Sequence, residues 1–274
     1  MIKRILVGLA GTAFTPIAIQ RAVALAKAHG AEVTGVTVLD SQRLRRLPAP
    51  AGIGHPLQPS DLPIPLSPDS IEEATQRLEK ACKEAGVKCR LLRESGDAFT
   101  TFIDAARYHD LIVFGLGSLL KYAFPGDNPN DQLIRLIDAG VRPLIAVAEE
   151  FRPISRVLIA YSGSMESAKA MKRFVQMRLW PDAELKVMTF NPSYERAYEL
   201  LSAAEEYCRV HGFKVCHQSN PGDPKVLLLP AATLWQADMI VMGNSARSVL
   251  MRQVLGDTLR TTLTETKVPL FLAQ

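Results

Sequence analysis

The chain has 274 residues, of which 47% are hydrophobic and 22% charged, and its formal net charge is +4. This is the composition of a folded globular protein, and so small a positive excess does not indicate a nucleic-acid binder. Four cysteines in a chain of this length exclude a disulfide framework and favour a reducing, cytoplasmic location.

The first apolar run, Ile5–Ala10, follows Lys3 and Arg4 and resembles the start of a signal peptide. The same pattern returns at Arg156–Ala160, deep in the chain, where a signal peptide cannot lie. Both runs are therefore interpreted as buried strands. The most apolar later run, Val226–Trp235, is far shorter than the ~20 residues that span a bilayer, so no membrane partner is expected.

The predicted elements alternate between strands and helices. Short apolar runs indicate strands, and helical spacing that ends at glycine indicates helices. In chain order we expect a strand at 5–10, a helix at 16–29, a strand at 33–39, a helix at 71–85, a strand at 87–92, a helix at 99–108, a strand at 111–114, a helix at 131–137 and a strand at 144–147. Residues 157–272 repeat this order. Five strands alternating with helices predict a parallel sheet with helices on both faces.

The repeat is visible residue by residue. In order, the matching segments are Ile2–Val7 with Ile154–Ile159, Ala31–Val33 with Ala183–Leu185, Gly86–Lys88 with Gly212–Lys214, Gly96–Asp97 with Gly222–Asp223 and Asp110–Gly115 with Asp238–Gly243. We therefore predict an α/β fold of two tandem doubly wound, Rossmann-like domains, residues 1–149 and 153–274, each with a five-stranded parallel sheet. Their closing strands, 144–147 and 270–272, are sheet edges that could pair or be covered.

The first domain carries one segment that the second lacks. Between Ser41 and Pro68 there are seven prolines, which fix φ and supply no N–H, so an extended, irregular insertion is expected. We interpret it as a surface loop. The alternative is a lid or docking strap over the strand ends.

The most informative stretch for function is Met242–Arg247, followed by Leu255–Thr258. Glycine directly after a strand lets the backbone approach a ligand, and free N–H groups at a helix start bind anions. Gly243 and Gly256 lie thirteen residues apart and could hold a polyphosphate between them. A simple turn after the strand is the alternative interpretation. In sheets of this kind, ligands bind beyond the carboxyl ends of the strands.

Four segments carry a resemblance to a known family: Val157–Ser164, Gly222–Pro224, Ala237–Gly243 and Val268–Leu272. With them, the duplicated unit resembles the universal stress protein family in its tandem two-domain form, over the whole chain except the Pro-rich insertion. That family divides into members that bind ATP and members that do not. Binders resemble the pattern Gly, two residues, Gly, nine residues, Gly, then Ser or Thr.

The second domain keeps part of that pattern. Gly243 and Gly256 fit the first and third glycines, whereas Ala246 and Asp257 replace the second glycine and the Ser or Thr. A carboxylate beside phosphate repels it, and Thr258, one residue late, or Mg²⁺ would compensate.

Binders also carry an Asp at the end of the first strand, where this domain has Ser162, and Phe190 matches their second-strand contact. In the first domain Ala10 replaces that Asp, and of the glycines only Gly115 fits. The family's phosphate contacts are therefore not expected in the first domain.

The resemblance implies a non-catalytic universal stress protein that binds an adenine nucleotide (ATP, ADP or AMP), with Mg²⁺ as its companion ion, mainly in the second domain. At most weak ATP hydrolysis is expected, without catalytic residues and without a protein-ligated metal. The expected nucleotide-binding residues are Ala160, Ser162, Phe190, Met242, Gly243, Asn244, Ser245, Ala246, Arg247, Gly256, Asp257 and Thr258. The alternative is a stress scaffold without nucleotide, which acts through protein partners or another small ligand. A homodimer is left open.

Two rival interpretations carry less weight. The stretch Tyr161–Ser167 resembles the pyrophosphate-binding loop of the adenylating ATP pyrophosphatases, but it also reads as a helix start with Ser164 as N-cap. Cys208, His211, Cys216 and His217 are soft metal ligands in poor tetrahedral geometry. Cys208 matches Cys82 of the first domain, which favours helix packing over zinc.

Overall fold

A computed structural model describes residues 2–9, 12–39, 68–95, 98–115, 143–243 and 257–273. We refer to the chain up to residue 149 as the first half and from residue 153 as the second half. The first half contains β1 (Arg4–Gly8), α1 (Thr15–His29), β2 (Glu32–Leu39), α3 (Pro68–Ala85), β3 (Cys89–Ser95), α4 (Ala98–Ala106), β4 (Leu111–Gly115) and β5 (Leu144–Val147). The second half contains β6 (Arg156–Ala160), α7 (Met165–Met177), β7 (Glu184–Thr189), α8 (Tyr194–Val210), β8 (Lys214–Ser219), α9 (Pro224–Leu234), β9 (Met239–Gly243), α10 (Asp257–Glu265) and β10 (Leu270–Ala273). The expected helix at 131–137 and nearly all of the Pro-rich segment lie outside the described residues.

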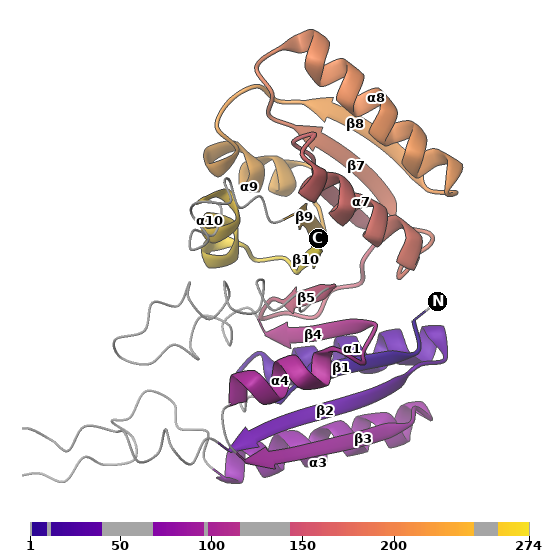
Figure 1. Cartoon of the computed structure of the whole chain (residues 1–274), viewed down its shortest axis with the longest axis vertical. Helices are drawn as coiled ribbons and strands as arrows, with labels where there is room; N and C mark the ends of the chain where they lie inside the picture. Colours follow the sequence, from indigo (N-terminus) through magenta and orange to yellow (C-terminus); the bar gives the residue numbers. More distant parts are fainter. Residues whose placement is uncertain are drawn as a thin grey trace, which may run out of the picture.

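The ten described strands form one sheet in the order β3-β2-β1-β4-β5-β10-β9-β6-β7-β8. Within each half all neighbouring strands are parallel, which confirms the predicted five-stranded parallel sheets. The two closing strands pair with each other, one of the two arrangements left open by the sequence. That pairing is antiparallel, with Phe271 opposite Ile145, and it joins the halves edge to edge (Figure 1). Pairing removes two exposed sheet edges within a single chain.

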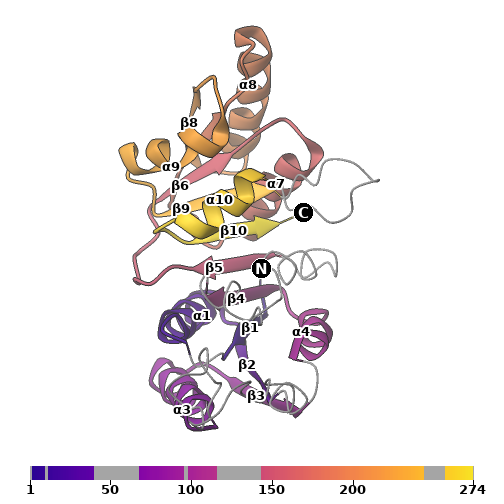
Figure 2. The same cartoon turned by 90° about the vertical axis from the view of Figure 1, so that its left-hand side faces the viewer.

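Helices cover both faces of the sheet, as α1 and α3 on one side and α4 on the other show in the first half (Figure 2). Neighbouring strand residues alternate between two apolar clusters, so that Ile5 and Val7 join one cluster and Leu6 joins the other. This burial on both faces explains why the strands are continuous apolar runs in the sequence. Among the described helices, none is long and apolar enough to cross a membrane.

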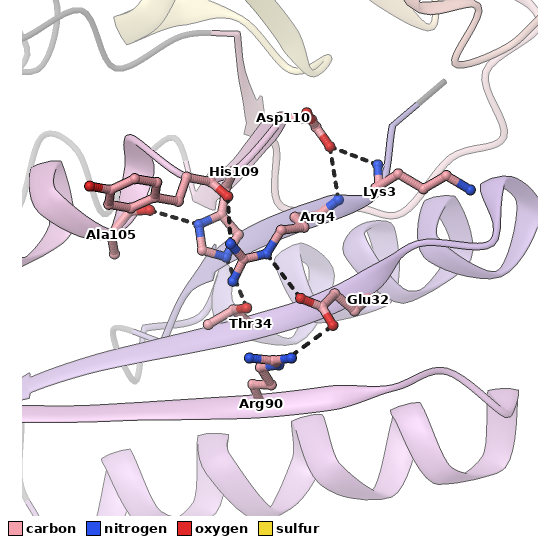
Figure 3. A network of polar contacts seen from close by, with 9 residues as sticks. Lys3, Arg4, Glu32, Thr34, Arg90, Ala105, His109 and Asp110 are labelled. Atoms are coloured by element: carbon pink, nitrogen blue, oxygen red, sulfur yellow. Dashed lines mark hydrogen bonds and ion pairs between the residues drawn. The ribbon is translucent and has the colours of Figure 1, made fainter.

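The repeat extends to individual hydrogen bonds at the amino ends of the strands, and Figure 3 shows those of the first half. In the first half, Asp110 Oδ2 accepts the backbone N–H groups of Lys3 at 2.7 Å and Arg4 at 2.9 Å. In the second half, Asp238 Oδ2 accepts those of Ser155 and Arg156, both at 2.9 Å. Each carboxylate therefore ties the start of one strand to the start of its neighbour.

A buried cation lies where the halves adjoin. Arg21 of α1 is 3% exposed, donates to the carbonyl of Arg152 and lies with its guanidinium 4.4 Å from the ring centre of Phe151. The centre of the Trp180 ring, in the second half, lies 5.7 Å from the same guanidinium. Burial lowers the pKa of Arg21 to about 10. Helix α1 is thus packed against residues 150–152, which link the two halves, and against the second half. The contact is made by aromatic rings on the desolvated guanidinium of Arg21.

Candidate functional site

The four helices described in the second half begin at the carboxyl ends of its strands. Helix α7 follows β6, α8 follows β7, α9 follows β8, and α10 leads back to β10, which runs parallel to β9. The backbone N–H groups of a first helical turn have no partner within the helix and favour negative charge. This edge of the sheet is therefore the best-placed anion site in the second half, and most of the sequence-predicted residues lie there.

The loop between β6 and α7 is organised by serines. Ser164 is the N-cap of α7 and accepts the N–H of Ser167 at 3.2 Å, which confirms the capping interpretation. Ser162 accepts the N–H of Ser164 at 3.3 Å and donates to the Ser167 hydroxyl. Gly163 between them has φ of 78°, and a Cβ there would meet the Leu200 side chain at 2.7 Å. The Ser162 hydroxyl is exposed and keeps a free lone pair as acceptor.

Gly243, the last residue of β9, is required by packing. A Cβ at this position would overlap the carbonyl group of Glu166 and lie 2.7 Å from the backbone nitrogen of Ser167. Glycine here lets the strand end approach the first turn of α7 closely. The sequence interpretation assigned this glycine to a phosphate, and the close helix contact is a second physical reason for it.

An apolar row crosses the end of the sheet on the α9 and α10 face. Ala160 is the register partner of Met188, and both belong with Met242 and the half-buried Phe190 to one apolar cluster. Three of the predicted residues, Ala160, Phe190 and Met242, are thus brought together. Ala160 and Phe190 are the partly exposed members of this group, and Met242 is buried beneath the strand ends.

The carboxylate of Asp257 is ion-paired. Asp257 opens α10, and its Oδ2 lies 2.7 Å from the Lys225 ammonium in the first turn of α9. The hydrogen bond from Lys225 holds the pKa of Asp257 below its usual value, and the same bond raises the pKa of Lys225. Both side chains are substantially exposed. The repulsion that a lone carboxylate would exert on a phosphate is therefore offset by a neighbouring cation.

Lys225 is the residue that sequence reasoning missed. Its signal was its place one residue after the matched segment Gly222–Pro224, in the first turn of the helix that Asp223 caps by accepting the N–H of Lys225 at 2.9 Å. Thr258 follows Asp257 in the first turn of α10, as expected for a helix start. The other predicted phosphate contacts, Asn244, Ser245, Ala246, Arg247 and Gly256, lie outside the described residues.

The corresponding place in the first half is filled by aromatic rings. A Cβ at Gly8 would lie 2.5 Å from the ring of Phe114, and Phe114 packs edge-on against Phe102 with ring centres 5.4 Å apart. Phe14 belongs to the same apolar cluster. The described part of this strand edge is therefore aromatic core. Ala10 and the segment after Gly115 lie outside the described residues.

The soft ligands singled out in the sequence have other partners. Cys208 is buried in the core, His211 contacts the Tyr207 carbonyl at 2.8 Å through Nδ1, and His217 contacts the Glu205 carboxylate. Across the described ranges, no three metal-ligating side chains gather into a cluster.

Comparison with known proteins identifies the family of this chain. The chain matches the model of the universal stress protein family over residues 1–120 and 192–274. It belongs to that family. A universal stress protein of Synechocystis sp. is 24% identical over 191 residues, which are 68% of this chain and 66% of that protein.

Two solved structures resemble the whole chain. A universal stress protein of Archaeoglobus fulgidus aligns over 99% of this chain and 96% of its own, with a TM-score of 0.69 and 17% identity. A functionally unknown protein of Pseudomonas aeruginosa aligns over 99% of this chain and 92% of its own, with a TM-score of 0.62 and 18% identity. At these identities the likeness establishes the fold of a tandem universal stress protein and not its ligand.

Proposed function

We propose that this universal stress protein binds one adenine nucleotide, ATP, ADP or AMP, at the carboxyl edge of its second half. The observation that carries the proposal is the Lys225–Asp257 pair, which joins the first turns of α9 and α10 at 2.7 Å. An ammonium between two positive helix ends favours a polyanion. Asp257, once released, is a suitable oxygen ligand for a Mg²⁺ ion that accompanies the phosphates.

The base and phosphates would divide between the two parts of this edge. Phe190 and Ala160, on the apolar row, would pack against the adenine, and the free lone pair of Ser162 would accept a hydrogen bond from its amino group. Residues 243–247 and 256–258 would hold the phosphates from the ends of β9 and α10. The aromatic packing of Phe102 and Phe114 supports a single site per chain.

We infer binding without turnover from the two carboxylates that open α9 and α10. Hydrolysis would need a side chain that orients water for attack on a phosphorus atom. At this edge Asp223 caps α9, and Asp257 pairs with Lys225. Neither carboxylate is positioned as an unpaired base.

A second candidate is a scaffold that holds no nucleotide. It is favoured by Gly243, whose lack of a side chain is explained by the contact with Glu166, and by Ser162, whose hydroxyl donates a hydrogen bond to Ser167. Both residues would then serve the fold, and the protein would act through protein partners or another small ligand.

Native mass spectrometry of freshly purified protein and calorimetric titration with ATP and Mg²⁺ separate the two candidates. Nucleotide binding predicts one nucleotide per chain. Lys225→Met should weaken it about tenfold, equivalent to ~1.4 kcal/mol. Lys214→Met, at the amino end of β8, is the matched control and should leave affinity unchanged. Gly256→Val should abolish binding in a folded protein. A wild-type protein without bound mass or heat would instead support the scaffold.

A further inference from the structure

An open pocket lies at the amino edge of the first half, in the other half of the chain from the proposed nucleotide site. Its volume is about 690 Å³, and it is lined by the starts of β1 and β2, the ends of α1 and α3, and the residues just before β3. A volume of this size is typical of small-molecule sites. The charged residues of its lining are four cations and one carboxylate, namely Lys3, Arg4, Lys27, Lys88 and Glu32.

The one carboxylate of the pocket is already paired. Glu32 lies 2.9 Å from the Nε of Arg4 through one oxygen and 3.5 Å from the Nε of Arg90 through the other (Figure 3). By contrast, the three lysine ammonium groups of the pocket have no hydrogen bond or ion pair with any residue that the structure describes. The positive charge that a ligand can reach is therefore carried by these lysines.

The helix ends beside the pocket are closed by their own backbone. The carbonyl of Ala26 in α1 accepts the N–H of Ala31, and the carbonyl of Cys82 in α3 accepts the N–H of Val87, both at 2.9 Å. A place in the last turn of α1 accounts for Lys27, because a cation there complements the helix dipole. The other two lysines lie just before β1 and β3, and capping does not account for them.

The second half closes the equivalent space with an arginine. Helices α1 and α7 both end on a residue in the left-handed conformation, Gly30 in the first half and Arg178 in the second. The Arg178 guanidinium lies 5.5 Å from the ring centre of Phe213 and donates to the His211 carbonyl. It therefore bridges the ends of α7 and α8.

The first half keeps this space open. Gly30 has no side chain, and Val87 stands where the second half has Phe213. A Cβ added at Gly30 or at Gly86 would meet no described, non-neighbouring residue within 4 Å, whereas a Cβ at the matching Gly212 would lie 3.4 Å from the Arg178 guanidinium. The repeated unit can thus fold with this space closed, and the pocket is a property of the first half.

We propose that this pocket binds a small oligophosphate, an anion with several phosphate groups in a row. Lysine binds phosphate as a point charge, and three ammonium groups around one pocket suit negative charge that is spread along a chain. The guanidinium groups of Arg4 and Arg90, which could hold a carboxylate in bidentate geometry, are engaged by Glu32. The ligand is a free oligophosphate or the phosphate chain of a nucleotide. The proposal does not rest on nucleotide binding in the second half.

The test is calorimetric titration of the whole protein with inorganic tripolyphosphate in the absence of Mg²⁺. It uses Lys225→Met, in which the proposed nucleotide site has lost its cation, and one saturable site should remain. Adding Lys88→Met should weaken this site about fivefold. Adding Lys214→Met is the matched control and should leave affinity unchanged, because Lys214 holds the same place in the second half, where Arg178 closes the space.

Two further titrations define the ligand. Higher NaCl concentration should weaken binding, because the lysines are exposed and their charges are screened. Saturation with ATP distinguishes the two sources of phosphate. If ATP abolishes the tripolyphosphate heat in Lys225→Met, the pocket accepts the phosphate chain of a nucleotide. If the heat persists, the pocket takes the free oligophosphate.

Three results would overturn the proposal. The first is a Lys225→Met protein without saturable heat at millimolar tripolyphosphate, including the case in which only the wild type binds, which would assign the anion to the nucleotide site. The second is equal affinity with and without Lys88→Met. The third is an equal loss in Lys88→Met and Lys214→Met, which would indicate unspecific attraction to a basic surface. Circular dichroism melting checks that each variant is folded.

Discussion

Gly243 at the end of β9 lies directly against the backbone of Glu166 in the first turn of α7, with no room for a Cβ between them. The contact joins a strand end to the start of a helix that belongs to a different βα unit. It positions the helix N-terminus over the carboxyl edge of the sheet, where the nucleotide is proposed to bind.

Gly243→Ala tests this packing role. The added methyl group must displace the Glu166 carbonyl, so we expect a loss of about 1–3 kcal/mol in the free energy of unfolding, even without nucleotide. Urea denaturation of the ligand-free protein measures it. If stability is unchanged and only nucleotide affinity falls, the glycine serves the ligand and not the helix contact.

Asp110→Ala and Asp238→Ala should have matching effects, because each carboxylate accepts two backbone N–H groups at the amino edge of the sheet. Each substitution should cost about 1–3 kcal/mol in unfolding free energy. The Asn variants keep one acceptor oxygen and should lose less. Equal stability of the Ala variants and the wild type in thermal and urea unfolding would contradict this.

Ser164→Ala removes the N-cap of α7. We expect the free energy of unfolding, measured by urea denaturation, to fall by about 1 kcal/mol, in the usual range for a lost cap. Ser164→Asp retains an acceptor and adds a negative charge at the positive helix end, so it should preserve stability. A Ser164→Asp protein as unstable as Ser164→Ala would show that the serine network, and not the cap, is what matters.

Arg21→Met should leave the free energy of unfolding unchanged or raise it. The buried guanidinium has an Nε without a hydrogen-bond partner among the described residues, and burial lowers its pKa to about 10, so its charge is costly to bury. Methionine keeps an apolar side chain in contact with the rings of Phe151 and Trp180 without that cost. Arg21→Ala leaves a cavity and should lose about 2 kcal/mol or more. A loss in Arg21→Met as large as in Arg21→Ala would mean that the cation itself holds the halves together.

Asp257→Asn should tighten the binding of nucleotide in the absence of Mg²⁺, because it removes a negative charge and releases Lys225. With Mg²⁺ present the variant lacks the carboxylate proposed as a ligand of the ion. Lys225 lowers the pKa of Asp257, so the wild-type carboxylate stays ionised until the pH falls below its usual pKa of 3.8. The affinity ratio of variant to wild type should therefore be constant between about pH 5 and pH 8 in calorimetric titrations. The stabilising ion pair is present throughout that range and is lost only at lower pH. An Asp257→Asn variant that binds Mg²⁺-free nucleotide no more tightly than the wild type would mean that the paired carboxylate does not oppose the phosphates.

Much of the architecture could be predicted from neighbours in the sequence. The apolar run Leu111–Phe114 and the glycine that ends α1, Gly30 with φ of 62°, are local signals of a buried strand and of a helix end. The Ser164 cap is equally local. Repetition of these signals in order predicts two copies of one unit, because each copy must bury its strands on both faces.

Other features depended on residues that are far apart in the sequence. The pairing of Lys225 with Asp257 requires two helix starts to be adjacent, and that adjacency is set by the strand order. The antiparallel junction of Phe271 with Ile145 requires two sheet edges to match in register. Local patterns reflect backbone preference and burial, which each segment carries by itself. Contacts across the fold arise only after the sheet has assembled, so only the tertiary structure decided which charges pair and which glycines meet a neighbouring backbone.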